Sequence, residues 1–311
     1  MRVAVVGGGV IGMTVAHELA SSGHEVTVVT ARNHHDSTSS IAAAIWFPYE
    51  VGHSPRVDES AAVTYRRLVA LSDDPATGVR LREGTVLSRT ASPDLSWMET
   101  VPSARPAAVV PPGCSGIRCH LPLVVTDVYL SWLRDQLMGL GVRFETRAVS
   151  SVDADLPDAD AVVIAAGLGS AALVGGDPSL HPVRGQIVRL ANPGLTDFVL
   201  DDDNPAGLTY VVPRDDDIVC GGTDDAHSWD ERPDAAVEAA ILARATALVP
   251  DLTGLPVKSR AVGLRPARPT VRLEPLPSFS RPVIACYGHG GSGFTLSWGE
   301  AADVRRLLPP A

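Results

Sequence analysis

The sequence predicts an α/β fold in which a dinucleotide-binding unit is combined with an inserted β-rich unit. Three observations lead to this prediction. A glycine-rich loop follows an apolar strand near the N-terminus, a second such loop lies near the C-terminus, and alternating strand patterns with aspartate-rich turns lie between them. The composition is globular, because 45% of the 311 residues are hydrophobic and 20% are charged.

The N-terminal pattern is a strand, a glycine loop, a helix and a second strand. Residues 3–6 are apolar and mostly β-branched, which is typical of a strand buried on both faces. The loop 7–12 (GGGVIG) opens a helix that ends at Gly23, and residues 25–30 (EVTVVT) form the next strand. This order predicts a Rossmann-like βαβ unit with the GxGxxG spacing.

Each glycine of this loop has a physical role in binding a dinucleotide. Gly7 allows a tight turn, Gly9 lets the backbone approach a pyrophosphate, and Gly12 lets the helix pack closely on the strand. Val10 and Ile11 begin the helix, whose N-terminus faces the phosphates. A glycine-rich turn without a ligand is the alternative.

The same unit continues in the middle of the chain. Residues 126–140 carry one apolar stripe and predict a helix capped by Thr126. Strands are expected at 142–146 and 161–166, and the second strand runs into Gly167.

A third part of the unit lies at the C-terminus. Residues 283–287 predict a strand, residues 288–293 (GHGGSG) repeat the GxGxxG spacing, and residues 294–308 predict a helix.

The intervening regions predict the β-rich unit. Residues 53–121 are rich in proline, arginine and turn residues, and residues 181–257 alternate as strands do. The aspartate runs 201–203 and 215–217 are expected to be solvated turns, because like charges repel. We therefore assign residues 1–52, 122–180 and 258–311 to the dinucleotide-binding domain, and 53–121 and 181–257 to the substrate-binding domain.

Charge and lysine content exclude several classes of function. The formal net charge is −10 and the sequence has no cluster of Lys or Arg, so nucleic acid and anionic membranes are not expected partners. The one lysine, Lys258, does not follow a glycine-rich phosphate loop. Its neighbours (PVKSR) do not indicate the shielded pocket that a reactive lysine needs. Phosphate-loop NTPases and Schiff-base enzymes are therefore not expected.

The cysteines and apolar segments indicate a cytoplasmic protein. The four cysteines form no CxxC pair, which speaks against a zinc ribbon or redox dithiol, and no metal site is expected. The first apolar run turns directly into glycines, as a strand does and a signal peptide does not, and no 18-residue apolar stretch could span a membrane. Cys220 and Cys286 each end a predicted strand. Two free thiols are the expected state, and a disulfide is the alternative.

The identity of the dinucleotide follows from both ends of the chain. The second strand ends in Thr30 without the acid that usually binds a ribose, and Arg32 could instead hold an adenine-ribose edge or the 2′-phosphate of NADP. A second strand–glycine–helix unit favours a longer cofactor held at two places. Its helix N-terminus could face a ring that becomes anionic on reduction, as flavin does.

Four segments resemble the D-amino acid oxidase family. They are residues 42–49 (AAAIWFPY), 183–187 (VRGQI), 263–269 (GLRPARP) and 287–295 (YGHGGSGFT), which follow the family's order and cover nearly the whole chain. The resemblance implies a non-covalent FAD enzyme with a GxGxxG FAD-binding domain and a β-rich substrate domain.

The resemblance also implies a role for particular residues. Arg265 matches the arginine that holds the substrate α-carboxylate bidentately, and Tyr210 matches the tyrosine that helps to hold it. Gly291 matches the carbonyl that accepts from the substrate amine, and Phe47 and Val212 would line the side-chain pocket. The expected FAD contacts are Arg32, Ser39, Ala43, Ala44, Val149, Gly167, Gly290, Gly291, Ser292, Gly293, Phe294 and Thr295.

The sequence departs from the family at the entrance to the site. Better-known eukaryotic members have a second tyrosine on a lid loop shortly before the position of Tyr210, but the segment from Leu200 to Tyr210 contains no other tyrosine. We therefore expect a site without an aromatic lid and with an open mouth.

The expected reaction is oxidation of a D-amino acid by FAD and oxygen to a 2-oxo acid, ammonia and hydrogen peroxide. A hydride passes from Cα to flavin N5, so no acid–base residue is required, and His289 is expected to be structural. No second Arg or His is placed for another carboxylate, which favours neutral substrates. The sequence is compatible with a homodimer but does not fix the oligomeric state. The alternatives are a glycine or secondary-amine oxidase, an NADP-dependent reductase motivated by Arg32, and a flavin-binding protein without turnover.

Overall fold

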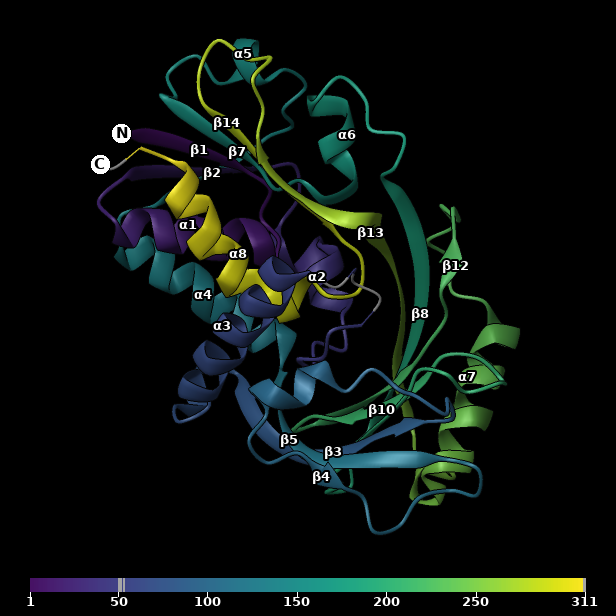
Figure 1. Cartoon of the computed structure of the whole chain (residues 1–311). Coiled ribbons are helices and arrows are strands. Elements are labelled where there is room, and N and C mark those ends of the chain that lie inside the picture. The colour runs from purple at the N-terminus through teal and green to yellow at the C-terminus, as the bar shows by residue number, and fades with distance from the viewer. Residues whose placement is uncertain (50–51, 53, 310–311) are drawn as a thin grey trace.

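The computed structural model describes residues 1–49, 52 and 54–309. It has the predicted α/β fold, in which one long, strongly curved sheet runs through the molecule (Figure 1). At one end of this sheet the strands are all parallel, in the order β14 (Val283–His289), β7 (Ala161–Ile164), β1 (Arg2–Val6), β2 (Glu25–Thr30) and β6 (Arg143–Thr146).

The other end of the sheet is mostly antiparallel. Pairing passes from β14 to β13 (Val257–Pro275) and then to β8 (His181–Ala191), β11 (Asp217–Gly221), β10 (Thr209–Pro213) and β9 (Phe198–Asp201). The short β12 (Asp225–Ala226) pairs with β8 beyond the end of β11. The far edge is made by β3 (Val79–Ser88), β5 (Ser115–Val124) and β4 (Arg105–Pro106).

The long helices cover the sheet in two groups (Figure 1). Beside the parallel strands lie α1 (Val10–Ser21), α4 (Thr126–Gly139) and α8 (Gly293–Leu307), with α1 packed on α8. Helix α3 (Pro55–Leu71) also packs on α8 and contacts β3 and β5. Helix α7 (Ala235–Leu248) instead covers β8, β10 and β11. The remaining helices are short: α2 (Thr38–Ile41), α5 (Val152–Asp155) and α6 (Ser170–Leu173).

The sequence pattern of β1 explains why the sheet is covered on both faces. Val3 and Val5 belong to the apolar cluster under α1, α4 and α8, whereas Ala4 and Val6 belong to a second cluster on the opposite face. Successive side chains of a strand alternate between faces, so a continuous apolar strand must be buried on both. The strand predicted at 25–30 is confirmed as β2, and the helix predicted after the first glycine loop is confirmed as α1.

Strand β13 joins the two kinds of sheet. Its first half pairs with β8 from Val257 to Ala267, and its second half pairs with β14 as far as Pro275. In Figure 1 it runs beside β8 and continues to β14 in the parallel region. The domain boundaries stay a prediction, and α3, which we assigned to the substrate-binding domain, packs on α8 of the dinucleotide-binding domain.

Two local predictions are wrong. Thr126 does not cap α4. The cap position is Val125, and the Thr126 hydroxyl donates to Ser40 O at 2.8 Å. The run 201–203 is not simply a solvated turn, because Asp201 is fully buried at the end of β9 and forms an ion pair with Arg89. A distant cation compensates the buried charge, which no local pattern reveals.

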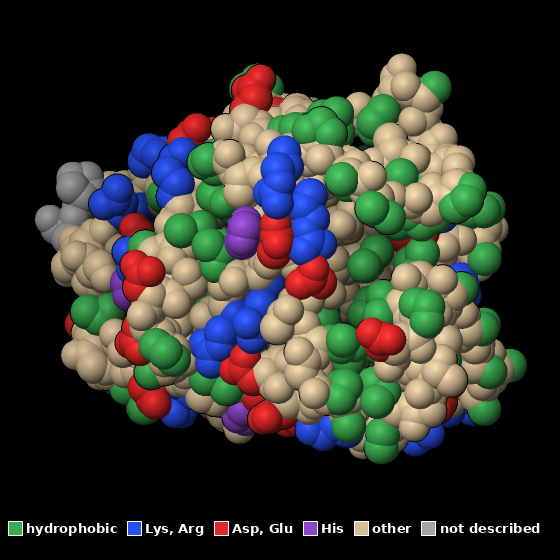
Figure 2. All heavy atoms as spheres, turned by 90° about the horizontal axis from the view of Figure 1, so that it is seen from below, with side chains coloured by type: hydrophobic (Ala, Val, Ile, Leu, Met, Phe, Trp, Pro, Cys, Tyr) green, Lys and Arg blue, Asp and Glu red, His purple; other side chains and the backbone are tan. Residues whose placement is uncertain are grey.

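Cations and anions are interleaved on the surface. Figure 2 shows Lys/Arg and Asp/Glu side chains in alternation on the face seen from below. Over β3 and β5, for example, Glu83 pairs with both Arg105 and Arg118, which hold the pKa of its carboxyl at about 2. Within the described residues, no helix is both long enough and apolar enough to cross a membrane. The four cysteines are free thiols, as expected.

Candidate active site

The first glycine loop brings three backbone segments into close contact. Gly7 has φ +128°, and a Cβ atom there would lie 2.2 Å from the carbonyl oxygen of Ala165 on the neighbouring strand. A Cβ atom at Gly12 would lie 2.0 Å from Gly7 O, so α1 can pack on the loop only without a side chain at this position. The Val10 N–H donates to Ser39 Oγ at 3.0 Å, and Gly9 lies beside the same hydroxyl.

The second glycine loop lies against the first. Strand β14 continues two residues further than predicted, to His289, because that residue still pairs with Ala267 of β13. Helix α8 then begins at Gly293, where a Cβ atom would lie 3.8 Å from Val10 Cγ1. The N-termini of α1 and α8 therefore meet, although they come from opposite ends of the chain. Two helix N-termini provide partial positive charge and backbone N–H groups at one place.

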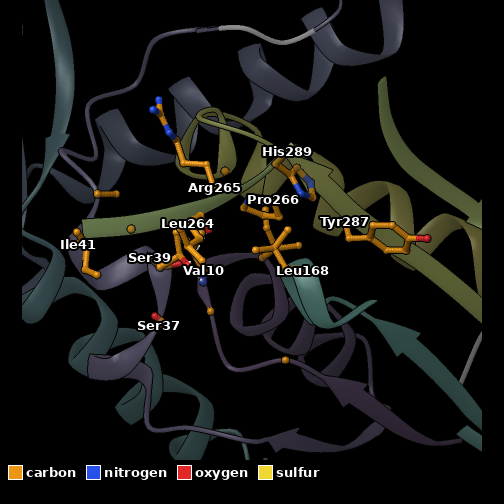
Figure 3. Close-up of a pocket in the computed structure, with 18 of the residues that line it drawn as sticks. Val10, Ser37, Ser39, Ile41, Leu168, Leu264, Arg265, Pro266, Tyr287 and His289 are labelled. Carbon is orange, nitrogen blue, oxygen red and sulfur yellow. Dashed lines mark hydrogen bonds between the residues drawn. The ribbon is translucent and has the colours of Figure 1, made fainter. Parts of the chain in front are cut away.

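A cavity of about 850 Å³ extends from these loops along β13 (Figure 3). It is lined by most of the residues that the sequence analysis selected, namely Gly7, Gly9, Val10, Ile11, Arg32, Ser39, Ala43, Ala44, Phe47, Val149, Gly167, Tyr210, Arg265, Gly290, Gly291, Gly293 and Phe294. Arg32 lies just after the end of β2, and Arg147, another lining residue, donates its backbone N–H to Thr30 O at the same place.

Four selected residues lie outside this lining. Gly12 is packed under the loop, and Val212 is fully buried in the apolar cluster of the sheet. The Ser292 hydroxyl donates to Tyr49 O at 2.6 Å, and the Thr295 hydroxyl donates to Phe47 O at 2.8 Å. Ser292 and Thr295 therefore fix the segment that carries Phe47 and Tyr49 to the start of α8.

Arg265 reaches across β8 from β13. A Cβ atom at Gly185 would lie 3.1 Å from its Nη2 atom, so the guanidinium passes directly over this glycine. Its Nη2 donates to the carbonyl oxygen of Thr223, whereas its buried Nε has no hydrogen-bond partner within the part of the chain that the structure describes. In Figure 3, Arg265 extends away from Val10 and Ser39. Because Arg265 also lines the cavity, this unpaired donor of a cation is available to bind an anionic ligand there.

Tyr210 lies over a pair of glycines on the adjacent strand. Cβ atoms at Gly221 and Gly222 would lie 2.1 and 3.0 Å from the phenol group of Tyr210. Burial raises the pKa of the Tyr210 hydroxyl, and the nearby Arg265 guanidinium lowers it by a smaller amount. The hydroxyl is therefore protonated near neutral pH and can donate a hydrogen bond beside Arg265.

The sequence analysis did not assign a role to Tyr49. Its ring centroid lies 5.9 Å from the Arg265 guanidinium carbon, and a Cβ atom at Gly291 would lie 2.6 Å from its Cδ1. Tyr49 therefore packs between the predicted carboxylate site and the second glycine loop. It belongs to the quoted segment 42–49, in which the resemblance assigned the pocket only to Phe47, although both residues line the cavity.

An aromatic residue does line the cavity near its mouth. Trp229 comes from the segment after β12, rather than from the segment between Leu200 and Tyr210, and its side chain is 65% exposed. The expected lack of a second tyrosine between Leu200 and Tyr210 holds, but the expectation that no aromatic residue lies at the entrance does not.

A buried polar cluster supports the second glycine loop. Glu300 of α8 is fully buried, lies 2.6 Å from Arg56 Nη1, and lies 3.5 Å from His289 Nε2. Burial raises the pKa of the Glu300 carboxyl, but His289 and Arg56 outweigh this effect, so the pKa lies below its usual value. The Cys286 thiol donates to Glu300 at 3.7 Å, and burial keeps its pKa far above the usual value.

This cluster is an ion-pair network rather than a metal centre. Ligand atoms of Cys286, His289 and Glu300 lie within 4.8 Å of one another. Arg56, however, already neutralises the carboxylate, and a metal bound there would repel the guanidinium. His289 also lines the cavity, so its structural role stays a prediction.

The site fits a long dinucleotide that carries a flavin ring. Two helix N-termini and a closely approached glycine loop suit a pyrophosphate, and the cavity continues past the second loop to Arg265. Arg32 at the end of β2, both glycine loops and Arg265 all line this one cavity.

Comparison with known proteins identifies the class to which this site belongs. The family model described as FAD dependent oxidoreductase (DAO) matches residues 2–306. The chain therefore belongs to this family and is an FAD-dependent oxidoreductase. Two curated relatives are named D-amino-acid oxidase. The one from Rubrobacter xylanophilus is 45% identical and covers 100% of this chain and 96% of its own. The one from Streptomyces coelicolor is 39% identical and covers 98% and 96%.

Solved structures show the same fold. Glycine oxidase from Geobacillus kaustophilus matches with a TM-score of 0.82 at 23% identity, and covers 98% of this chain and 94% of its own. At this identity the likeness concerns the fold and leaves the substrate open.

Proposed function

We propose that this protein oxidises D-amino acids to 2-oxo acids, with ammonia and hydrogen peroxide as the other products. The observation that carries the proposal is Arg265, whose buried Nε has no partner among the described residues at the end of a cavity suited to FAD. A bidentate guanidinium is the group best suited to hold an α-carboxylate. The names of the two curated relatives support the same substrate class.

The substrate would be held at three points. Arg265 and the Tyr210 hydroxyl bind its α-carboxylate, and the Gly291 carbonyl accepts from its amine. Its side chain points toward Phe47 and the cavity mouth. Because three fixed points around Cα define its handedness, such a site can select one enantiomer.

The protein would orient and polarise rather than transfer protons. FAD, when bound, supplies the redox chemistry by accepting a hydride from Cα and passing the electrons to oxygen. Near Arg265 the lining includes the two tyrosines Tyr210 and Tyr49. The raised pKa of the Tyr210 hydroxyl disfavours the deprotonated form that a general base would need. The N-terminus of α8 would stabilise negative charge on the ring.

The cofactor would be held without a covalent bond. The segments that would hold it are the first glycine loop, Ser39, residues 42–44 and the second glycine loop. The buried Cys286 thiol has a pKa far above its usual value, which disfavours the thiolate needed for covalent attachment.

A peroxide-coupled screen of the purified holoenzyme tests the proposal. We expect a yellow protein that releases peroxide with neutral D-amino acids such as D-alanine and D-methionine, and not with their L-enantiomers. Activity restricted to glycine and sarcosine would assign it instead to the glycine or secondary-amine oxidases. A colourless protein that takes up no FAD would overturn the proposal.

A homodimer in the cytoplasm stays a prediction from the sequence. Light scattering on the purified protein measures the assembly, and fluorescence imaging of a tagged chain measures its location.

A further inference from the structure

A short loop at the mouth of the cavity is fixed by two buried polar residues. This outer loop, residues 227–234, connects β12 to α7. Arg184, which is 6% exposed, donates from Nε to Asp230 O at 2.9 Å and from Nη2 to Arg232 O at 2.8 Å. The fully buried Gln186 donates to Asp234 O at 2.8 Å and accepts from Asp234 N at 2.9 Å.

These contacts explain the segment 183–187, to which the sequence analysis gave no role. Arg184 and Gln186 face the outer loop, and Gly185 between them leaves space for the Arg265 guanidinium on the opposite face of β8. A buried charge is costly unless it is paired, and Arg184 places several of its donors on backbone oxygens of a surface loop. The loop is therefore held in one position relative to Arg265.

The outer loop places an aromatic ring and a carboxylate in the lining of the cavity. Trp229 and Glu231 both line it, and both are exposed to solvent. Asp202 also lines it, just beyond the end of β9, whose Leu200 pairs with Tyr210. Among the described residues, the Lys and Arg side chains of the lining are Arg32 and Arg147 beside β2, and Arg265.

The two ends of the substrate would therefore meet opposite charges. Arg265 offers a cation to the α-carboxylate, whereas Asp202 and Glu231 give the mouth of the cavity a negative potential. A second carboxylate on the side chain of the substrate would be repelled there. A cationic side chain would be attracted by the carboxylates and by the face of the indole ring.

We propose that the outer loop is a specificity element that favours D-amino acids with a long cationic side chain, such as D-lysine, over anionic ones. Trp229 and Glu231 contact the side chain, and Arg184 and Gln186 are positioning residues that act through the loop. This inference rests on the proposed function and names the substrate class of the same site.

The first test compares side chains of equal length in the holoenzyme. For the wild type we expect kcat/KM to rank D-lysine above D-norleucine and D-glutamate. Glu231→Gln and Trp229→Ala should each lower the D-lysine to D-norleucine ratio about two- to fivefold, mainly through KM. Added salt should lower the same ratio more in the wild type than in Glu231→Gln. The control Glu59→Gln, on the exposed face of α3, should leave the ratio unchanged.

The second test asks whether Arg184 acts through the loop. Arg184→Ala should lower the D-lysine to D-norleucine ratio while FAD content and the flavin spectrum stay those of the wild type. In the double variant with Glu231→Gln, the two effects should not add, because a displaced loop no longer presents the carboxylate. Full additivity would exclude the positioning role. Since Trp229 and Glu231 are exposed, their variants test the loop even where Arg184→Ala fails to fold.

The outcomes separate the two proposals. If the wild type oxidises no D-amino acid, the proposed function itself is wrong. If it oxidises D-amino acids but the ratio is the same in the wild type, Glu231→Gln and Trp229→Ala, the outer loop does not set specificity and this inference is overturned.

Discussion

The Arg265 guanidinium crosses β8 directly above Gly185, so the position of a cation on one strand depends on the absence of a side chain on the next. A Cβ atom at Gly185 would lie 3.1 to 3.3 Å from three atoms of the guanidinium group. Most contacts of a real Cβ atom are longer than this. The relationship makes Gly185 part of the proposed substrate site, although it offers no functional group.

Gly185→Val is expected to weaken substrate binding while FAD binding is retained. The added branches would push the guanidinium off the glycine, at a cost of about 1–3 kcal/mol for an overpacked contact. Steady-state kinetics should show the loss mainly as a raised KM, with the flavin spectrum unchanged. Gly139→Ala, where the added Cβ meets nothing within 4 Å, is the control. A Gly185→Val enzyme with wild-type KM would contradict the close approach.

Arg265→Ala is expected to lower kcat/KM by the equivalent of about 2–5 kcal/mol, because a buried charge-assisted pair with the carboxylate is lost. Arg265→Lys should recover part of this loss, since an ammonium keeps the charge but not the bidentate geometry. Stopped-flow reduction of the flavin at varied substrate concentration measures the effect. Unchanged affinity in Arg265→Ala would show that the carboxylate is bound elsewhere.

Tyr210→Phe is expected to cost about 1.5–3 kcal/mol in kcat/KM, as for a hydrogen bond to a charged group. The raised pKa also predicts a pH dependence. A group whose folded pKa lies above its usual value keeps its proton to higher pH, so the Tyr210 hydroxyl should still donate at pH 10. Between pH 7 and 10, the ratio of wild-type to Tyr210→Phe activity should therefore stay constant. If the ratio of wild-type to Tyr210→Phe activity already decreases at a pH well below 10, the assignment is contradicted.

Glu300→Gln is expected to destabilise the fold by about 1–3 kcal/mol near neutral pH, because Arg56 and His289 lose their anionic partner. The lowered pKa fixes the sign of the pH effect. An acid with a depressed folded pKa stabilises the fold above its unfolded pKa, about 4.3, and this stabilisation is lost as the pH falls through the folded value. Thermal unfolding from pH 7 down to pH 3 should thus show a smaller acid loss of Tm in Glu300→Gln than in the wild type. Parallel curves would exclude this coupling, and Glu59→Gln serves as the matched control.

The parts of the site that local sequence determines were predictable. Each glycine loop lies between a strand and a helix within one short segment, so spacing alone placed Gly7, Gly9 and Gly293 at helix N-termini. The resemblance added Arg265 and Tyr210, which the structure brings to the same cavity. Their roles in binding stay proposals, because no ligand contact tests them.

The remaining features depend on contacts between distant segments. Val212 lies two residues beyond Tyr210 and so shares its face of β10, yet it is fully buried because the apolar cluster covers this part of the strand. Asp201 is buried through Arg89, which is 112 residues away in the sequence. Trp229 lines the cavity from a loop whose backbone is contacted by Arg184 and Gln186 of β8. Neither periodicity nor motif spacing in the sequence predicts such contacts between distant segments.

Strand β13 runs through both parts of the sheet, which limits rotation of the two domains relative to each other. Arg265 lies on β13, which pairs first with β8 and, further along, with β14, the strand that leads into the second glycine loop. A hinge rotation of the two domains would have to break backbone hydrogen bonds between β13 and its neighbouring strands. The pairing of β13 with both β8 and β14 therefore favours local movement at the mouth of the cavity over rotation of the two domains.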